Sequence, residues 1–532
     1  MRKLFLAGTA LAGVCLGALS AGDAGAAGAP DRSPRANGVG APIAWGVCDP
    51  PGPDLQCARI RVPLDWDRPN GRTISLALIR HLASKPEQRI GTMFTNPGGP
   101  GDTGLGLVQG DPDGLDALGD GRFDVVSWDP RGTHASTRVK CFTSQRSESR
   151  FWAGVTIPIT KAESEGFKRT AAAYARRCGE VSGWLLPHIS TADTVRDLEH
   201  LRVLLGEEKL TYLGLSYGTY LGQTYANMFG DRIRAMMLNG IVDPVEYSKG
   251  SEARLAATVR PSDAVYDQFL ALCDSAGPER CALAGGRHTA AERFDRLSAR
   301  LKRAPIPAPG AQPPLSAPQK LGYADLLISQ FSPIRAPRTW PTNAANLAAA
   351  LRGDGSTLES AATASYTPGA WALITPSTAI QCADASAHRR LRAWPSVIAR
   401  FARISRLQGA LQGWWQWAPC AAWPVRGEDT YRGPWTASTP NPILLANSTF
   451  DPNTGYANAV HAEQLLGNAV LITQEGYGHL TSQNPSACVD QAITDYLTEL
   501  ITPPAGTVCQ SDQQPFDPDF ASRSASGPDG QK

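Results

Sequence analysis

A serine between two glycines is the first candidate for chemistry in this sequence. Gly214-Leu215-Ser216-Tyr217-Gly218 matches the pattern G-x-S-x-G, between an apolar run at 210–213 and a helix-like stretch at 217–229. Glycines remove the Cβ atoms that would clash in a sharp strand-to-helix turn, and such a turn lifts the serine hydroxyl above the sheet. The string alone is a weak signal, so the strand and helix around it carry the prediction that Ser216 is a nucleophile.

An acid and a histidine follow in the order that such a serine requires. Asp451 comes shortly after the strand-like run 442–446, and His479 comes after the run 469–473. The chain order Ser, Asp, His is that of α/β-hydrolases. In this arrangement His479 takes the proton from Ser216, and Asp451 holds the imidazole in the correct tautomer. Three other histidines lack this context: His134, His188 and His461.

A loop rich in glycine and proline is a candidate for stabilising an oxyanion. The short strand 92–95 runs directly into Asn96-Pro97-Gly98-Gly99-Pro100-Gly101. Backbone N–H groups exposed by such a loop can bind the negative oxygen of a tetrahedral intermediate. We expect Gly98 or Gly99 to share this role with the N–H of Tyr217, the residue after the nucleophile.

The elements that must position these residues alternate between strand and helix. Strands are predicted at 73–80, 123–128, 210–214 and 234–238, and a helix capped by Ser190 or Thr191 ends near Gly206. Short apolar strands that alternate with helices predict an α/β fold with a mostly parallel sheet and helices on both faces. Residues 136–187 are less regular.

The alternation of strands and helices stops in the middle of the chain and resumes near its end. We predict one α/β-hydrolase core made of residues 41–245 and 431–510, with residues 246–430 inserted as a mainly helical cap. In the cap, Trp414, Trp415 and Trp417 are interpreted as packing residues rather than substrate contacts. Residues 511–532 are polar and predicted to be a flexible tail.

The first 26 residues have the features of a secretory signal. A basic start at 1–3 precedes an apolar run at 4–19, and Ala24-Gly25-Ala26 is a cleavage pattern. Cys15 offers a lipoprotein alternative, although Val14 fits a lipobox poorly. Residues 27–40 are predicted to be a flexible lead-in. We therefore expect a secreted protein, free or associated with the cell wall.

The cysteine count agrees with export. Eleven cysteines without Cys15 leave ten, and an even number in an exported chain predicts disulfides. Pairing between neighbours along the chain is our hypothesis, because short loops are easy to close: Cys48–Cys57, Cys141–Cys178, Cys273–Cys281, Cys382–Cys420 and Cys488–Cys509. No C-x-x-C or H-x-x-x-H pair is present, so no metal and no cofactor are predicted.

Composition limits the partners. The 532 residues are 42% hydrophobic and 19% charged, with a net charge of +2 and no long basic run. Nothing here favours nucleic acid or an anionic membrane surface as a partner. No run after the signal reaches the length of a transmembrane helix. We expect a monomer that acts on peptides or small proteins.

Several motifs together resemble one family. They are TNPGGPG at 95–101, DVVSWDPRG at 124–132, GLSYGTYLG at 214–222, LNGIVDP at 238–244, AIQCAD at 379–384, ANSTFDPNT at 446–454 and GYGHL at 476–480. The chain resembles the secreted tripeptidyl aminopeptidases of actinobacteria, which are related to proline iminopeptidases. Asn96 and Asn239 depart from the family's pattern, and this bears on substrate preference.

The resemblance implies an α/β-hydrolase with a helical cap and a C-terminal segment, called TAP-like, that completes the triad. It also implies a serine exopeptidase that removes short peptides, tripeptides in this family, from free N-termini. A cap carboxylate is the natural partner for the substrate's ammonium group, and Asp384 is our candidate. The same triad hydrolyses esters, so a carboxylesterase, a lactonase or a prolyl-type aminopeptidase remains an alternative.

Overall fold

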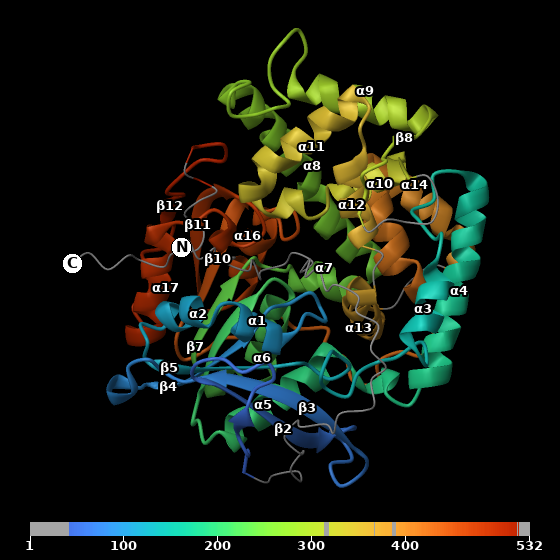
Figure 1. Ribbon diagram of the computed structural model, residues 1–532. Coiled ribbons are helices and arrows are strands. Elements are labelled where there is room, and N and C mark those ends of the chain that lie inside the picture. The colour runs from blue at the N-terminus through green and yellow to red at the C-terminus, as the bar shows by residue number, and fades with distance from the viewer. Residues whose placement is uncertain (1–41, 313–318, 366–367, 386–389, 519, 521–532) are drawn as a thin grey trace.

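The computed structural model describes residues 42–312, 319–365, 368–385, 390–518 and 520. The predicted signal peptide, the lead-in and most of the predicted tail lie outside this set. One ten-stranded sheet forms the centre of the molecule, and a layer of helices lies over one end of it (Figure 1). Within the described residues, none of the helices has the length and apolar character needed to cross a bilayer.

The sheet is antiparallel at one edge and parallel over the rest. In spatial order its strands are β1 (Gly46–Val47), β2 (Leu55–Pro63), β3 (Thr73–His81), β5 (Phe123–Trp128), β4 (Gly91–Asn96), β6 (Leu210–Leu215), β7 (Ile233–Asn239), β10 (Ile443–Phe450), β11 (Ala469–Tyr477) and β12 (Val508–Gln510). The first three pairings are antiparallel, and every pairing from β5 to β12 is parallel. The carboxyl ends of the parallel strands therefore meet along one rim.

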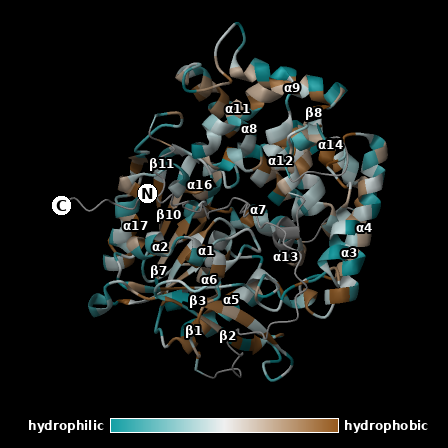
Figure 2. Ribbon diagram, in the orientation of Figure 1, coloured by the Kyte–Doolittle hydropathy of each residue, from teal (hydrophilic) through white to brown (hydrophobic). Residues whose placement is uncertain are grey.

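Helices cover both faces of the sheet. One face carries α1 (Gly104–Gly110), α2 (Pro112–Leu118) and α17 (Ala487–Glu499), and the other carries α5 (Thr191–Leu204), α6 (Tyr217–Phe229) and α16 (Tyr456–Leu465). Neighbouring strand residues alternate between these two cores, as the two-residue period of a strand requires. Tyr212 and Met236 face one core, whereas Leu213 and Met237 face the other. Figure 2 shows the central strands as mostly hydrophobic.

The helical layer over the sheet comes chiefly from the middle of the chain. Its helices are α7 (Pro244–Lys249), α8 (Ser251–Ala276), α9 (Ala290–Arg303), α10 (Tyr323–Ser329), α11 (Trp340–Arg352), α12 (Ser356–Ala364), α13 (Pro368–Asp384), α14 (Trp394–Ile404) and α15 (Gly409–Gln412). The pair β8 (Ile306–Pro307) and β9 (Lys320–Leu321) is the one strand pairing that the described residues add there. We call this layer the cap.

Residues 136–187, for which the sequence analysis predicted no regular element, contain helices. They include α3 (Gln145–Trp152) and α4 (Lys161–Ser182), which lie beside the cap (Figure 1). Trp152 and Phe167 from these helices pack on the buried rings of Trp414 and Trp415. The tryptophan cluster is thus part of a packed core, and an N-terminal segment contributes to the cap.

The start of the predicted tail is also packed. Phe516 is buried and lies against Phe269 and Trp340 of the cap. The hydroxyl of Ser511 accepts a hydrogen bond from the side-chain amide of Gln474 and donates one to the carbonyl oxygen of Glu475, near the end of β11. The hydrophobic side chain of Phe516 explains the difference, because it adds apolar contact in a stretch whose overall composition is polar.

All five predicted disulfides are present. The sulfur atoms of each neighbouring pair, from Cys48–Cys57 to Cys488–Cys509, are bonded. Cys382–Cys420 ties the end of α13 to the tryptophan cluster, and Cys488–Cys509 ties α17 to the last strand. Covalent ties of this kind limit the freedom of the unfolded chain and are typical of exported proteins.

Candidate active site

Ser216 occupies a strained turn between β6 and α6. Its φ of 54° and ψ of −121° are unusual for a residue with a side chain and cost on the order of 1–3 kcal/mol. Two backbone hydrogen bonds hold the turn, from the N–H of Ser216 to Asn239 and from Thr219 to Ser216. A Cβ at Gly214 would lie 2.6 Å from the oxygen of Gly218, and one at Gly218 would lie 2.5 Å from the oxygen of Asn96. The glycines of the motif are therefore required by close approach.

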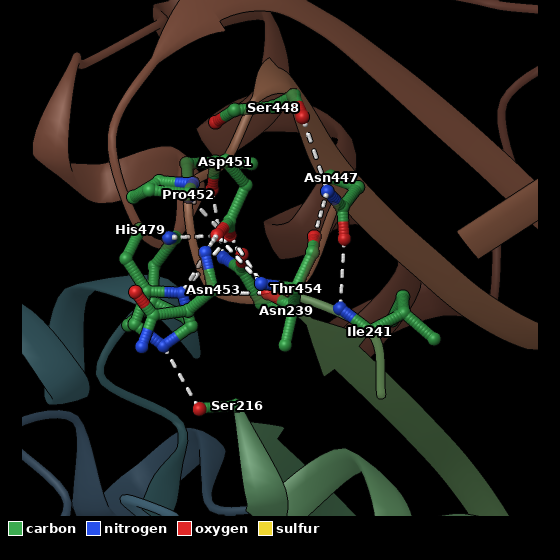
Figure 3. Close-up of polar contacts among 12 residues, drawn as sticks. Ser216, Asn239, Ile241, Asn447, Ser448, Asp451, Pro452, Asn453, Thr454 and His479 are labelled. Carbon is green, nitrogen blue, oxygen red and sulfur yellow. Dashed lines mark hydrogen bonds and ion pairs between the residues drawn. The ribbon is translucent and has the colours of Figure 1, made fainter. Parts of the chain in front are cut away.

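The structure brings the three predicted triad residues together (Figure 3). The Nε2 of His479 lies 2.8 Å from the Oγ of Ser216, and its Nδ1 lies 3.0 Å from both carboxylate oxygens of Asp451. Asp451 follows β10 and His479 follows β11, so neighbouring parallel strands deliver both to the same rim as Ser216. Asp451 and His479 are almost completely buried. This geometry supports proton transfer from the hydroxyl to the imidazole.

Asp451 is held as a fixed negative charge. Its Oδ1 accepts hydrogen bonds from the N–H groups of Asn453 and Thr454, and its Oδ2 accepts from the Thr454 hydroxyl and the Leu480 N–H. Burial alone would raise the pKa of Asp451, but His479 and these donors outweigh it, and the pKa lies below its usual value. Sequence reasoning missed Thr454; its position three residues after the acid is the only local signal.

Hydrogen bonds hold the loop that carries His479 to the sheet on one side and to the cap on the other. The N–H of Thr481 donates to the side-chain oxygen of Asn239, whose amide nitrogen donates back to the Thr481 hydroxyl. On the cap side, the N–H of His479 donates to the carbonyl oxygen of Arg335 at 2.8 Å. Asn239 is one of the two residues that depart from the family's pattern, and its role here is to orient the histidine loop.

The glycine-rich loop lies against the serine turn. Gly98 has a φ of +97°, and a Cβ at this position would lie 2.8 Å from the nitrogen of Tyr217. The N–H of Gly98 donates to the side chain of Asn96 at 3.0 Å. Among the described residues, no acceptor is found for the N–H of Gly99 or Tyr217. These two N–H groups are free to bind an oxyanion, whereas the N–H of Gly98 is already used. The geometry therefore favours Gly99 over Gly98 as the oxyanion donor from this loop.

The carboxylate of Asp384 accepts hydrogen bonds from other residues of the protein. It is buried, and it accepts hydrogen bonds from the N–H and hydroxyl of Thr191 at 2.7 Å each and from the Tyr247 hydroxyl at 3.0 Å. The Thr191 hydroxyl also contacts the hydroxyl of Tyr217, next to the nucleophile. Burial raises the pKa of Asp384, and Thr191, Arg254 and Tyr247 lower it less. A role in binding a substrate's ammonium group remains a prediction.

The three histidines that the sequence analysis set aside, His134, His188 and His461, have neighbours outside the triad. His134 contacts the carbonyl oxygen of Gly101, and His461 contacts Asp243 at 2.7 Å. His188 lies 3.9 Å from Glu428, and together with Asp65 they place one potential metal ligand each within 4.8 Å of one another. Glu428 is exposed, and Asp65 follows the end of β2.

The sheet, the strained serine turn and the order of the strand-end loops define an α/β-hydrolase. The chain is thus a hydrolase enzyme. Comparison with known families agrees: a model described as "alpha/beta hydrolase fold" matches residues 92–262, and one described as "TAP-like protein" matches residues 409–509.

Relatives among characterised proteins place the chain more closely. Serine protease Hip1 of Mycobacterium tuberculosis is 29% identical over 499 residues, which cover 88% of this chain and 91% of that protein. The tripeptidyl aminopeptidase of Streptomyces lividans is 29% identical over 491 residues, covering 89% and 86%. Carboxylesterase B of M. tuberculosis is 29% identical over 528 residues, covering 93% and 96%. The resemblance to tripeptidyl aminopeptidases that the motifs predicted is confirmed.

Proposed function

We propose that this protein is a secreted serine exopeptidase that removes short peptides, tripeptides in the first instance, from free N-termini. The observation that carries the proposal is the continuous contact from Ser216 through His479 to Asp451. The names of the relatives Hip1 and tripeptidyl aminopeptidase favour a peptide as substrate. The five disulfides and the signal-like start of the chain support secretion.

The mechanism follows from the contacts. The Ser216 oxygen attacks the peptide carbonyl carbon while Nε2 of His479 takes the hydroxyl proton. The carbonyl oxygen becomes an oxyanion, which the N–H groups of Gly99 and Tyr217 stabilise, aided by the N-terminal end of α6. His479 then gives its proton to the leaving nitrogen, the C–N bond breaks, and an acyl-enzyme remains. Water, deprotonated by His479, releases the acyl group and restores Ser216.

The reaction class has one specific rival. Carboxylesterase B is as similar in sequence to this chain as the peptidases are, and an ester carbonyl fits the same triad. An esterase would have no need to recognise a free ammonium group. Dependence on that group therefore separates the two functions.

Three substrates test the proposal: a tripeptide anilide with a free amine, the same anilide with its amine acylated, and a simple acyl ester. We expect rapid cleavage of the first and loss of cleavage on acylation. Equal cleavage of the two anilides, or cleavage of the ester alone, would replace the proposal with an esterase. Ser216→Ala should lower kcat roughly 10⁶-fold without changing the unfolding temperature by more than about 2 °C. Retained turnover in this folded variant would contradict the mechanism.

A further inference from the structure

Arg335 of the cap is attached directly to the histidine loop. It ends a short turn, η4 (Pro333–Arg335), and its carbonyl oxygen accepts the hydrogen bond from the N–H of His479. Gly478 has a φ of +101°, and a Cβ there would lie 2.9 Å from the Arg335 oxygen and 2.6 Å from Pro337. The backbone of Arg335 is therefore fixed beside the imidazole, whatever its side chain does.

Within the described residues, the guanidinium of Arg335 has no hydrogen-bond or ion-pair partner. None of its nitrogens donates a hydrogen bond to, or pairs with, a described residue, and its Nε is buried. Its closest aromatic neighbour is Phe331, whose ring centre lies 5.1 Å from the guanidinium carbon. A buried donor without an acceptor normally costs about 1–3 kcal/mol, more when it is charged, so the arrangement requires an explanation.

Arg131 shows how this protein satisfies a buried arginine when the role is structural. Its guanidinium donates to both carboxylate oxygens of Asp197 at 2.6 and 2.7 Å and to the carbonyl oxygens of Pro63, Leu64 and His188. Every nitrogen is occupied. Arg335 has the same five donors and its Nε is likewise buried, but no described residue accepts a hydrogen bond from them.

The charges near Arg335 belong to the active site. Burial lowers the pKa of Arg335, and the carboxylates of Asp102 and Asp451 offset the effect in part. Asp451 is already occupied by His479 and its own donors. Asp102 follows the glycine-rich loop, and its side chain also makes no hydrogen bond within the described residues. The two carboxylates that act on the Arg335 guanidinium thus both lie at the active site, and no described residue accepts a hydrogen bond from it.

The geometry points to Arg335 as a specificity residue that binds a carboxylate in the leaving group of the substrate. This inference rests on the proposed function. A guanidinium fork matches a carboxylate with two parallel hydrogen bonds. The leaving group must lie over Nε2 of His479, because that nitrogen protonates it, and the backbone of Arg335 is hydrogen-bonded to the N–H of the same histidine. The acyl part lies toward Gly99 and the oxyanion site.

A carboxylate in this place has two sources: the free C-terminus of a short peptide, or an acidic side chain just after the cleaved bond. Four otherwise identical peptides separate them. In the first pair, one residue follows the cleaved bond, and its C-terminus is either a free carboxylate or an amide. In the second pair, the residue after the cleaved bond is either Glu or Gln, and both peptides end in a C-terminal amide. We expect the wild type to favour the carboxylate in at least one pair by about ten- to a hundredfold in kcat/KM.

Arg335→Gln should abolish this preference, so that the carboxylate and amide members of a pair are cleaved with the same kcat/KM; the ratio within each pair is the readout, and the backbone contact to His479 is kept. Arg335→Lys should retain part of the preference, since it keeps the charge but not the fork. Arg338→Gln is the matched control. It removes a half-buried arginine three residues along, whose pKa is lowered by burial, and it should keep the full preference.

Two results would overturn the assignment: no preference in the wild type for either carboxylate, or an equal loss in Arg335→Gln on carboxylate and amide substrates. The test does not depend on peptidase activity. If only esters are cleaved, the proposed function fails, and Arg335 is tested on para-carboxyphenyl acetate against para-carbamoylphenyl acetate. The same loss of preference in Arg335→Gln would then support it, and no difference would refute it.

Discussion

The rim of the sheet and the cap both bury carboxylates, but they treat the charge in opposite ways. At the rim, Asp451 meets an imidazole and several N–H and hydroxyl donors, and its pKa lies below the usual value despite burial. In the cap, Glu359 is buried with one oxygen lacking a partner. Burial and the nearby Asp325 raise the pKa of Glu359 to about 7.

The difference in pKa shows which of the two regions stabilises a charged carboxylate for catalysis. Desolvation acts on both carboxylates, so the sign of the pKa shift is decided by the donors around them. The rim uses four donors to keep one negative charge in place beside His479, which is what stabilising an imidazolium requires. The cap, by contrast, tolerates one carboxylate, Glu359, whose charge changes near neutral pH.

The largest effect should come from neutralising the rim carboxylate. Asp451→Asn keeps the shape but lets the amide donate to Nδ1 of His479, which selects the wrong tautomer. We expect kcat to fall roughly 10⁴-fold, measured on the free-amine anilide. The variant should stay folded by circular dichroism. A loss below tenfold in the folded variant would show that the charge at this position is not needed.

A smaller loss is expected from the hydroxyl that supports this carboxylate. Thr454 donates to Asp451 at 2.8 Å and lies 3.3 Å from Nδ1 of His479. Thr454→Val removes the hydroxyl at nearly constant volume, and we expect kcat to fall about tenfold with KM unchanged. Thr454→Ser, which keeps the hydroxyl, is the control and should recover most of the activity. Equal losses in both variants would assign the effect to packing.

Sequence reasoning reached what local patterns determine. The bounds of α6 and β5, the order of the strand-end loops and the five disulfides agree with the structure. The parallel rim then brings distant loops together, which is why Ser216, Asp451 and His479 could be selected from the sequence and are found in contact.

What the sequence could not give depends on long-range contacts. α3 and α4 lie in a stretch for which no element was predicted, and they pack on cap residues more than 200 positions away. Asp384 was predicted as a partner for the substrate's ammonium group, and its donors Thr191 and Tyr247, which lie 193 and 137 residues away in the chain, could not be read from the sequence. Arg335 had no motif at all, and only the fold places it beside His479.

Asp384 sharpens the contrast between rim and cap. Its oxygens are occupied by Thr191 and Tyr247, so we expect Asp384→Asn to lower kcat/KM on the free-amine anilide less than about tenfold and to cost about 1 kcal/mol of unfolding free energy. Rates on the acylated anilide provide the comparison. If the variant loses as much activity as acylation of the substrate causes, Asp384 is the ammonium anchor after all.

The smallest effect concerns stability and pH in the cap. The folded-state pKa of Glu359, about 7, is above that of the unfolded chain, so the folded protein binds this proton more tightly. The stabilisation is complete below pH ~4 and is lost as pH rises to about 7, where a buried charge forms beside Asp325. Glu359→Gln should therefore raise the unfolding temperature by about 2 °C at pH 8 and leave it unchanged at pH 4, measured by calorimetry. A gain of the same size at both pH values would mean that better packing, not the removed charge, stabilises the cap, and the contrast with Asp451 would then lose its electrostatic basis.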